Sequence, residues 1–176
     1  IQRLLQGEGG GLILLPTREL ALQVDEDLRR VGQSLGLRTA VLIGGQSMQP
    51  QLQAIGRNPH IVVATPGRLN DHIEQQTVAL DAVRILVLDE ADRMLDMGFM
   101  PQVKRILNLL PRERQTMLFS ATLSSDIMRI ASMYMQLPIR VEVAPSGTTI
   151  EQVTQEIFIV PREAKSQLLE KVLSEY

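Results

Sequence analysis

Two adjacent carboxylates follow an apolar run in the stretch VLDEAD, residues 87–92. Mg²⁺ prefers oxygen ligands and keeps several waters, so a single carboxylate such as Asp89 suffices to hold it. The neighbouring Glu90 is then placed to orient or activate an attacking water, and phosphoryl transfer depends mostly on such positioning. A solvated acidic turn that begins a helix is the alternative for a bare D-E-x-D pattern. The apolar run before the carboxylates favours the metal-binding interpretation.

Polar and glycine residues also follow four other short apolar runs. In an open α/β sheet, ligands bind beyond the carboxyl ends of the strands. All five groups are therefore expected at one edge of the sheet, and this convergence is more informative than any single tetrapeptide. The other four groups are PTRE at residues 16–19, GGQ at 44–46, TPGR at 65–68 and SAT at 120–122.

The elements that position these groups alternate along the chain. Apolar runs without alternation predict strands that are buried on both faces, and apolar residues at helical spacing predict the helices between them. The alternation predicts an α/β fold with an open, mostly parallel sheet and helices on both faces. Strands are expected at residues 12–15, 39–43, 61–64, 84–88, 116–119 and 139–143, and helices at 20–35, 48–55, 67–75, from Pro101 onward and from a cap at Ser124.

Composition narrows the possible functions. The chain has 176 residues, a net charge of −2, no cysteine and two histidines, so thiolate and histidine-rich metal sites are excluded. The slightly acidic balance provides no global basic surface for nucleic acid. No apolar run approaches the roughly 20 residues needed to span a bilayer, and residues 1–15 lack the features of a signal peptide. His60 and His72 are expected to be ordinary polar or half-buried side chains.

Four glycines lie within residues 7–11, just before the first predicted strand. The phosphate-binding pattern G-x-x-x-x-G-K-[ST] instead follows a strand and opens a helix, and no Lys-Ser or Lys-Thr follows these glycines. Residues 7–11 are therefore expected to form a flexible surface loop and not a nucleotide cradle. Residues 1–6 are expected to be the end of a helix.

Five motifs resemble those of the DEAD-box RNA helicases. VLDEADRMLDMGF is similar to the family's Walker B segment, and PTREL, GG, TPGR and SAT occur in the family's order at plausible spacings. The resemblance implies a RecA-like fold of the P-loop NTPase type. It implies that residues 1–144 form most of a first RecA-like domain, that 145–151 form a linker, and that 152–176 begin a second such domain with a strand at 153–160 and a helix at 162–175.

The resemblance also implies ATP and Mg²⁺ as cofactors and RNA as the partner. Asp89 would position Mg²⁺, largely through water, and Glu90 would act on the attacking water. Asp92 would join Ser120 and Thr122 in a hydrogen-bond network that couples hydrolysis to strand separation. Main-chain groups at glycines and helix N-termini hold phosphates without reading sequence, which would let a chain of net charge −2 bind RNA. The residues that match the family's RNA-gripping motifs are Pro16, Thr17, Arg18, Gly45, Thr65, Pro66, Gly67 and Arg68.

The family's phosphate loop precedes PTREL, and no such loop occurs in these residues. We therefore expect a fragment of an ATP-dependent RNA helicase that is not a competent ATPase by itself. We also expect the missing strand to leave an unpaired edge beside the acidic strand. The protein is expected to be a cytoplasmic monomer without membrane contact. Two alternatives stay open. The first is a shortened, non-enzymatic domain that binds RNA or a protein partner. The second is a related DNA helicase or translocase, although the DEAD tetrad together with PTREL and TPGR favours RNA.

Three motifs also have simpler structural interpretations. Thr17 is a suitable cap for the helix that follows it, with Glu19 favourable in the first turn. TPGR is a common turn between a strand and a helix, and SAT alone indicates little.

Overall fold

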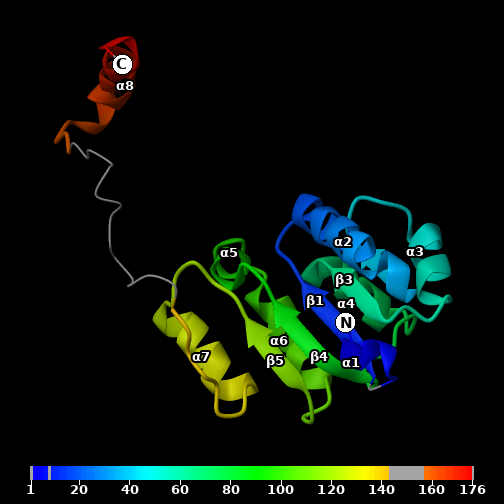
Figure 1. Cartoon of the computed structure of the whole chain (residues 1–176). Coiled ribbons are helices and arrows are strands. Elements are labelled where there is room, and N and C mark those ends of the chain that lie inside the picture. The colour runs from blue at the N-terminus through cyan, green and yellow to red at the C-terminus, as the bar shows by residue number, and fades with distance from the viewer. Residues whose placement is uncertain (1, 8, 143–156, 176) are drawn as a thin grey trace. The chain divides into compact units, whose positions relative to one another are not determined.

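The computed structural model describes residues 2–7, 9–142 and 157–175. The chain divides into two compact units, Ile1–Arg140 and Val141–Tyr176, and each is described by itself (Figure 1). In the second unit, the short helix η2 (Arg162–Ala164) leads into α8 (Lys165–Glu175). The helix predicted at 162–175 is thereby confirmed. The predicted strand at 153–160 is wrong for residues 157–160, which form no strand. Residues 153–156 and the linker 145–151 lie outside the described residues, and the second RecA-like domain stays a prediction.

The first unit is built on a fully parallel sheet with the strand order β2-β3-β1-β4-β5. This arrangement confirms the predicted open α/β fold. Leu12 of β1 lies opposite Val62 of β3 on one side and Leu86 of β4 on the other. The strands are β1 (Gly10–Leu14), β2 (Thr39–Leu42), β3 (Ile61–Ala64), β4 (Val83–Leu88) and β5 (Gln115–Leu118).

Helices cover both faces of this sheet (Figure 1). One apolar cluster joins α1 and α2 to the sheet, and a larger cluster joins α3, α4, α5, α6 and α7 to the opposite face. Within the described residues, no helix has the length and apolar character that crossing a membrane would require. The helices are α1 (Gln2–Leu5), α2 (Arg18–Gly32), η1 (Gln33–Leu35), α3 (Met48–Ile55), α4 (Pro66–Glu74), α5 (Ala91–Asp96), α6 (Met100–Leu109) and α7 (Ser125–Tyr134).

The glycines of residues 7–11 are not simply a flexible loop, because β1 already begins at Gly10. A Cβ atom at Gly11 would lie 3.1 Å from Leu4 Cδ1 and 3.3 Å from Ile61 Cγ1. Gly9 has a φ of +93°, and a Cβ there would overlap the main-chain oxygen of Ala82. A side chain at position 9 would force the backbone to shift, and one at position 11 would push on the Leu4 and Ile61 side chains, so these glycines let the short helix α1 lie close to the sheet.

The expected unpaired edge beside the acidic strand is also wrong. Strand β4 pairs with β1 on one side and with β5 on the other, so the strand that ends at Asp89 is interior. Strand β5 was expected to be buried, but it has one neighbour among the described residues. Its side chains are consequently half-buried or exposed, and Phe119 after it is 53% exposed.

Two further predictions differ from the structure. The helix expected at 20–35 ends at Gly32, where a Cβ would overlap the Leu37 side chain, and η1 then closes on the left-handed Gly36. Left-handed glycine is a common way to end a helix. The strand expected at 139–143 does not form over 139–142, since no strand pairs with these residues and Ile139 is 89% exposed. Val143 lies outside the described residues.

Candidate active site and nucleic-acid interface

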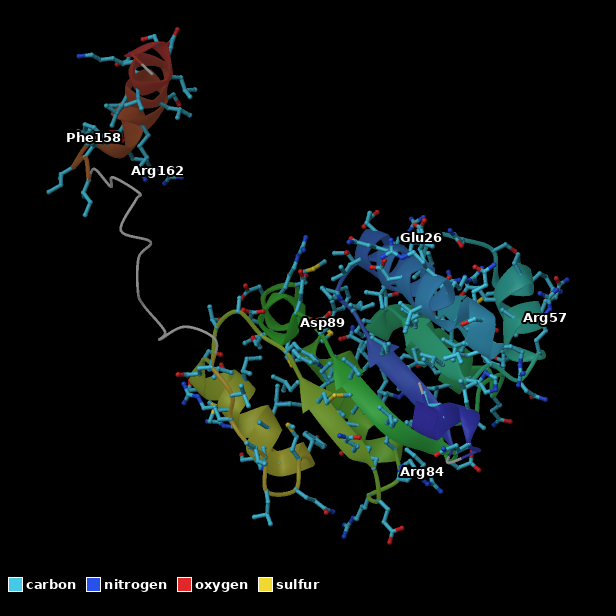
Figure 2. The ribbon with its side chains drawn as sticks, in the orientation of Figure 1. Glu26, Arg57, Arg84, Asp89, Phe158 and Arg162 are labelled. Atoms are coloured by element: carbon cyan, nitrogen blue, oxygen red, sulfur yellow. The ribbon has the colours of Figure 1, made fainter. Side chains whose placement is uncertain are left out.

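The predicted convergence at one sheet edge is confirmed by the all-parallel sheet. The main-chain N–H of Asp89 donates to Leu14 O at 3.0 Å, at the end of β1. The N–H of Phe119 donates to Leu88 O at 2.8 Å, at the end of β5. Figure 2 shows Asp89 at one end of β4 and Arg84 at the other. The acidic turn is thus held between two neighbouring strand ends.

Glu90 has a left-handed backbone, with φ 48° and ψ 51°. This conformation is uncommon for residues other than glycine, and it persists where the surrounding structure enforces it, often at functional sites. The Glu90 N–H donates to Asp89 Oδ1 at 2.9 Å. Glu90 Oε2 accepts from Arg93 Nη1 at 3.0 Å. The strained turn therefore separates the two carboxylates: Asp89 is tied to the main chain and Glu90 to a surface arginine.

Asp89 fits the magnesium ligand that the motif predicts. Its side chain is half-buried, and one carboxylate oxygen is used by the Glu90 N–H. Among the described residues, none donates a hydrogen bond to the other oxygen. The described residues contain no cluster of three or more carboxylate or histidine side chains that could enclose a metal. A single carboxylate with water completing the shell is the arrangement that Mg²⁺ commonly takes.

Asp92, Ser120 and Thr122 form the hydrogen-bond network that was expected. Asp92 Oδ2 accepts from the Thr122 main-chain N–H at 2.8 Å and from the Thr122 hydroxyl at 2.9 Å. The Ser120 hydroxyl accepts from the Asp92 N–H at 3.2 Å and donates to Thr122 O at 2.7 Å. Burial opposes ionisation, but the hydrogen bonds from Thr122, Arg93 and Ser120 outweigh it and lower the pKa of Asp92. An ionised Asp92 therefore ties α5 to the segment after β5.

A second cluster lies at the same sheet edge, around the loop of residues 44–46 after β2. Arg68 Nη1, on α4, donates to Gln46 O at 2.9 Å. Gly45 has a φ of +71°, and a Cβ there would overlap the Arg18 guanidinium. Among the described residues, none accepts a hydrogen bond from the N–H of Gly44 or Gly45. The cluster therefore combines two guanidinium groups with two available main-chain donors, which is the chemistry of an anion site.

The structure divides the predicted RNA-contacting residues by exposure. Pro16, Thr65 and Pro66 are buried, so their side chains can only shape the turns that they occupy. Gly67 is half-buried at the start of α4, and a Cβ there would meet nothing within 4 Å. Packing within the described chain therefore does not explain the glycine, and an approaching ligand would. The remaining members with exposed or half-buried surface are Thr17, Arg18, Gly45 and Arg68.

Thr17 caps α2, as its structural interpretation predicted: its Oγ1 accepts from the Leu20 N–H at 3.3 Å. We expect Thr17→Ala to lower the free energy of unfolding by about 1 kcal/mol, because the Leu20 N–H loses the side-chain oxygen that accepts its hydrogen bond. Urea denaturation followed by circular dichroism measures this change. Thr17→Ser, which keeps the cap, is the control, and an equal loss in both variants would contradict the capping role.

Sequence reasoning missed Gln51, whose amide bonds the residues that flank the loop of 44–46, and the contacts that connect it to His72 and Thr77. His72 was expected to be half-buried at most, but it is completely buried. Its ring lies between Gln51 and Thr77. No sequence signal identifies such a set, because the buried Gln–His contact joins two helices with a strand between them.

The sequence is similar to those of known proteins. The model of the DEAD/DEAH box helicase family matches residues 1–130. The chain is 46% identical over 162 residues to the ATP-dependent RNA helicase DbpA of Bacillus subtilis, covering 92% of this chain and 34% of that relative. It is 44% identical over 168 residues to the ATP-dependent rRNA helicase rrp3 of Aspergillus niger, covering 94% of this chain and 36% of the relative. The chain thus spans about a third of the length of these curated relatives.

Solved structures of two other proteins share the fold. The crystal structure of a DEAD box protein from the hyperthermophile Methanococcus jannaschii superposes with a TM-score of 0.69 at 43% identity, covering 72% of this chain and 34% of that chain. A hypothetical ATP-dependent RNA helicase from Sulfolobus tokodaii gives a TM-score of 0.72 at 35% identity, over 76% of this chain and 40% of that chain. With its acidic turn, its Asp92 network and its glycine loop on one sheet edge, the chain belongs to the DEAD/DEAH box helicase family.

Proposed function

We propose that this chain is the part of an ATP-dependent RNA helicase that grips the RNA backbone and supplies the acidic residues for ATP hydrolysis. The observation that carries the proposal is the shared sheet edge: the carboxylates after β4 and the donor-rich loop after β2 belong to one rigid parallel sheet. A change at one site can therefore be transmitted to the other through packed strand ends.

RNA binding would rest on backbone contacts. The N–H groups of Gly44 and Gly45 and the N-terminus of α4 are main-chain donors suited to phosphate oxygens. Arg18 and Arg68 add positive charge beside them. Such contacts position a strand without reading its bases, which fits a chain whose net charge is −2.

For ATP hydrolysis, Asp89 would hold Mg²⁺ through water and Glu90 would orient the attacking water. Mg²⁺ bound to the nucleotide would offset charge on the phosphates. Asp92, Ser120 and Thr122 would link that chemistry to RNA. The 176 residues contain no G-x-x-x-x-G-K-[ST] pattern, so a phosphate cradle has to be supplied from outside them, and we expect this chain alone to hydrolyse no ATP.

We also propose a cytoplasmic monomer. The absence of cysteine from the sequence suits a reducing compartment. A non-enzymatic RNA-binding or partner-binding domain is the second candidate, and the missing phosphate-loop pattern is the observation that favours it.

Gly67→Val tests RNA binding. We expect the affinity for a fluorescein-labelled uridine decamer, measured by fluorescence anisotropy, to fall about tenfold because the added side chain blocks an approaching phosphate. The variant should fold normally, since a Cβ at Gly67 meets nothing within 4 Å.

Gly10→Val is the matched control at the opposite edge of the sheet, where a Cβ would lie 3.8 Å from Ala82 O in ordinary contact. It is expected to leave the affinity unchanged. Equal affinities for Gly67→Val and the unmodified chain would exclude the N-terminus of α4 from the RNA site.

A further inference from the structure

The loop of residues 44–46 is held from beneath by a buried side-chain amide. Gln51 is 4% exposed. Its Nε2 donates to Ile43 O at 3.0 Å and to Ser47 O at 3.3 Å. These two carbonyls belong to the residues that flank the loop. One amide group therefore joins both ends of the segment whose N–H groups face the proposed RNA site.

The direction of each hydrogen bond follows from counting donors. A glutamine amide has two N–H donors and one acceptor oxygen. Both N–H groups of Gln51 are used by carbonyls, which can only accept, so Gln51 Oε1 is the atom that faces His72 Nε2 at 3.2 Å. His72 Nε2 must therefore carry a proton. In an uncharged ring Nδ1 is then an acceptor, and the Thr77 hydroxyl lies 2.8 Å from it and also donates to His72 O at 3.1 Å.

The surroundings of His72 favour this uncharged form. The ring is completely buried. Burial lowers the pKa of His72, and the charge of Arg68 lowers it further against the opposing effect of Asp71. Donation thus runs from His72 to Gln51 and from Gln51 to the two carbonyls that flank the loop, while the single Thr77 hydroxyl proton is shared between His72 O and His72 Nδ1.

This relay gives α4 a second connection to the loop. Arg68, one turn before His72 on the same helix, donates to Gln46 O. The relay reaches the flanking residues Ile43 and Ser47 through Gln51 on α3. Fixing a loop before binding removes part of the entropy cost of ordering it on the ligand. A loop that has lost the relay would bear that cost each time it binds.

We propose that Gln51 and His72 are positioning residues for RNA: they touch no ligand, and they hold the Gly44 and Gly45 N–H groups in the geometry that a backbone phosphate requires. The proposal rests on the proposed RNA binding and specifies how that site is kept in shape.

Gln51→Met is the primary variant, because methionine keeps the length of the side chain and removes every donor and acceptor of the amide. We expect the NMR order parameters of the Gly44 and Gly45 N–H groups to fall from the roughly 0.85 of rigid backbone toward about 0.6, while those of β3 stay unchanged. The dissociation constant for the labelled uridine decamer, corrected for the folded fraction, should rise about tenfold.

Rescue separates positioning from bulk stability. In His72→Gln, the amide nitrogen can replace Nε2 as the donor to Gln51, so the order parameters of Gly44 and Gly45 are expected to stay near those of the unmodified chain. In His72→Leu, no donor remains and the order parameters should match those of Gln51→Met. Asn70→Leu is the control for this measurement: Asn70 is 6% exposed and its amide donates to the carbonyls of Pro66 and Gln102. This variant should lose stability without changing the order parameters of the loop.

The outcomes distinguish the two proposals. If the unmodified chain fails to bind the decamer, the proposed function is wrong and positioning for RNA fails with it. If the unmodified chain binds and Gln51→Met changes neither the order parameters of Gly44 and Gly45 nor the corrected affinity, the relay is only structural and the inference alone is overturned.

Discussion

Glu90→Gln is expected to lower kcat for ATP hydrolysis by at least about 100-fold, which is the usual contribution of a positioned general base. The measurement requires a protein that joins this chain to a phosphate-loop segment and a complete second RecA-like domain. Glutamine keeps the size of the side chain and removes the basic oxygen, so the attacking water stays in place but loses its proton acceptor. Phosphate release with and without single-stranded RNA measures the change.

Glu74→Gln is the matched control for this prediction. Glu74 also pairs with an arginine, Arg105, on the surface of the molecule. Both substitutions therefore remove one exposed ion pair, which is worth about 1 kcal/mol or less. Only the change at Glu90 is expected to affect hydrolysis. Comparable rates in the two variants would mean that Glu90 is a surface carboxylate and that the water is activated elsewhere.

Arg68→Ala is expected to weaken binding of the uridine decamer by on the order of 100-fold. Its side chain is 11% exposed, and it connects α4 to Gln46 O while it pairs with Asp71 at 3.3 Å. Removing it takes away the support of the loop and a positive charge near the phosphates, and hydrogen bonds from charged groups are worth about 1.5–3 kcal/mol each. Fluorescence anisotropy at two salt concentrations measures the affinity and its salt dependence.

Two variants separate the parts of this effect. Arg30→Ala removes an arginine of the same charge near the end of α2, where it pairs with Asp27, and should leave binding nearly unchanged. Arg68→Lys keeps the charge but lacks the planar fork, so partial recovery is expected. Full recovery with lysine would show that charge alone matters, and an equal loss in Arg30→Ala would reduce the role of Arg68 to bulk electrostatics.

The sheet and its acidic edge could be predicted because their signals are local. Apolar runs such as residues 84–88 predict buried strands, and in a parallel sheet the groups after them must share an edge. The Asp92 contacts with Ser120 and Thr122 could be expected only through the family resemblance, since a long stretch of chain separates the partners.

Other features depend on information that a single stretch does not contain. The left-handed backbone at Glu90 is unusual for any residue but glycine, and it results from the strand ends that tie the turn down. The exposed character of β5 depends on how many neighbours it has, which its own residues do not specify. The Gln51–His72 relay joins residues of two helices, and neither residue type marks a contact by itself.

The position of β1 in the sheet has a consequence for how the chain folds. Strand β1 is synthesised before the other four described strands of the sheet, and it lies in the middle of them, between β3 and β4. Leu12 must therefore wait for Val62 and then Leu86 before both of its sides are paired. Contacts between such distant residues slow folding, because loop closure precedes the gain in stability. On the ribosome, Leu12 and Leu14 would have a partner on one side only until β4 and the proposed catalytic carboxylates after it have emerged, so the centre of the sheet and the acidic turn would be completed together.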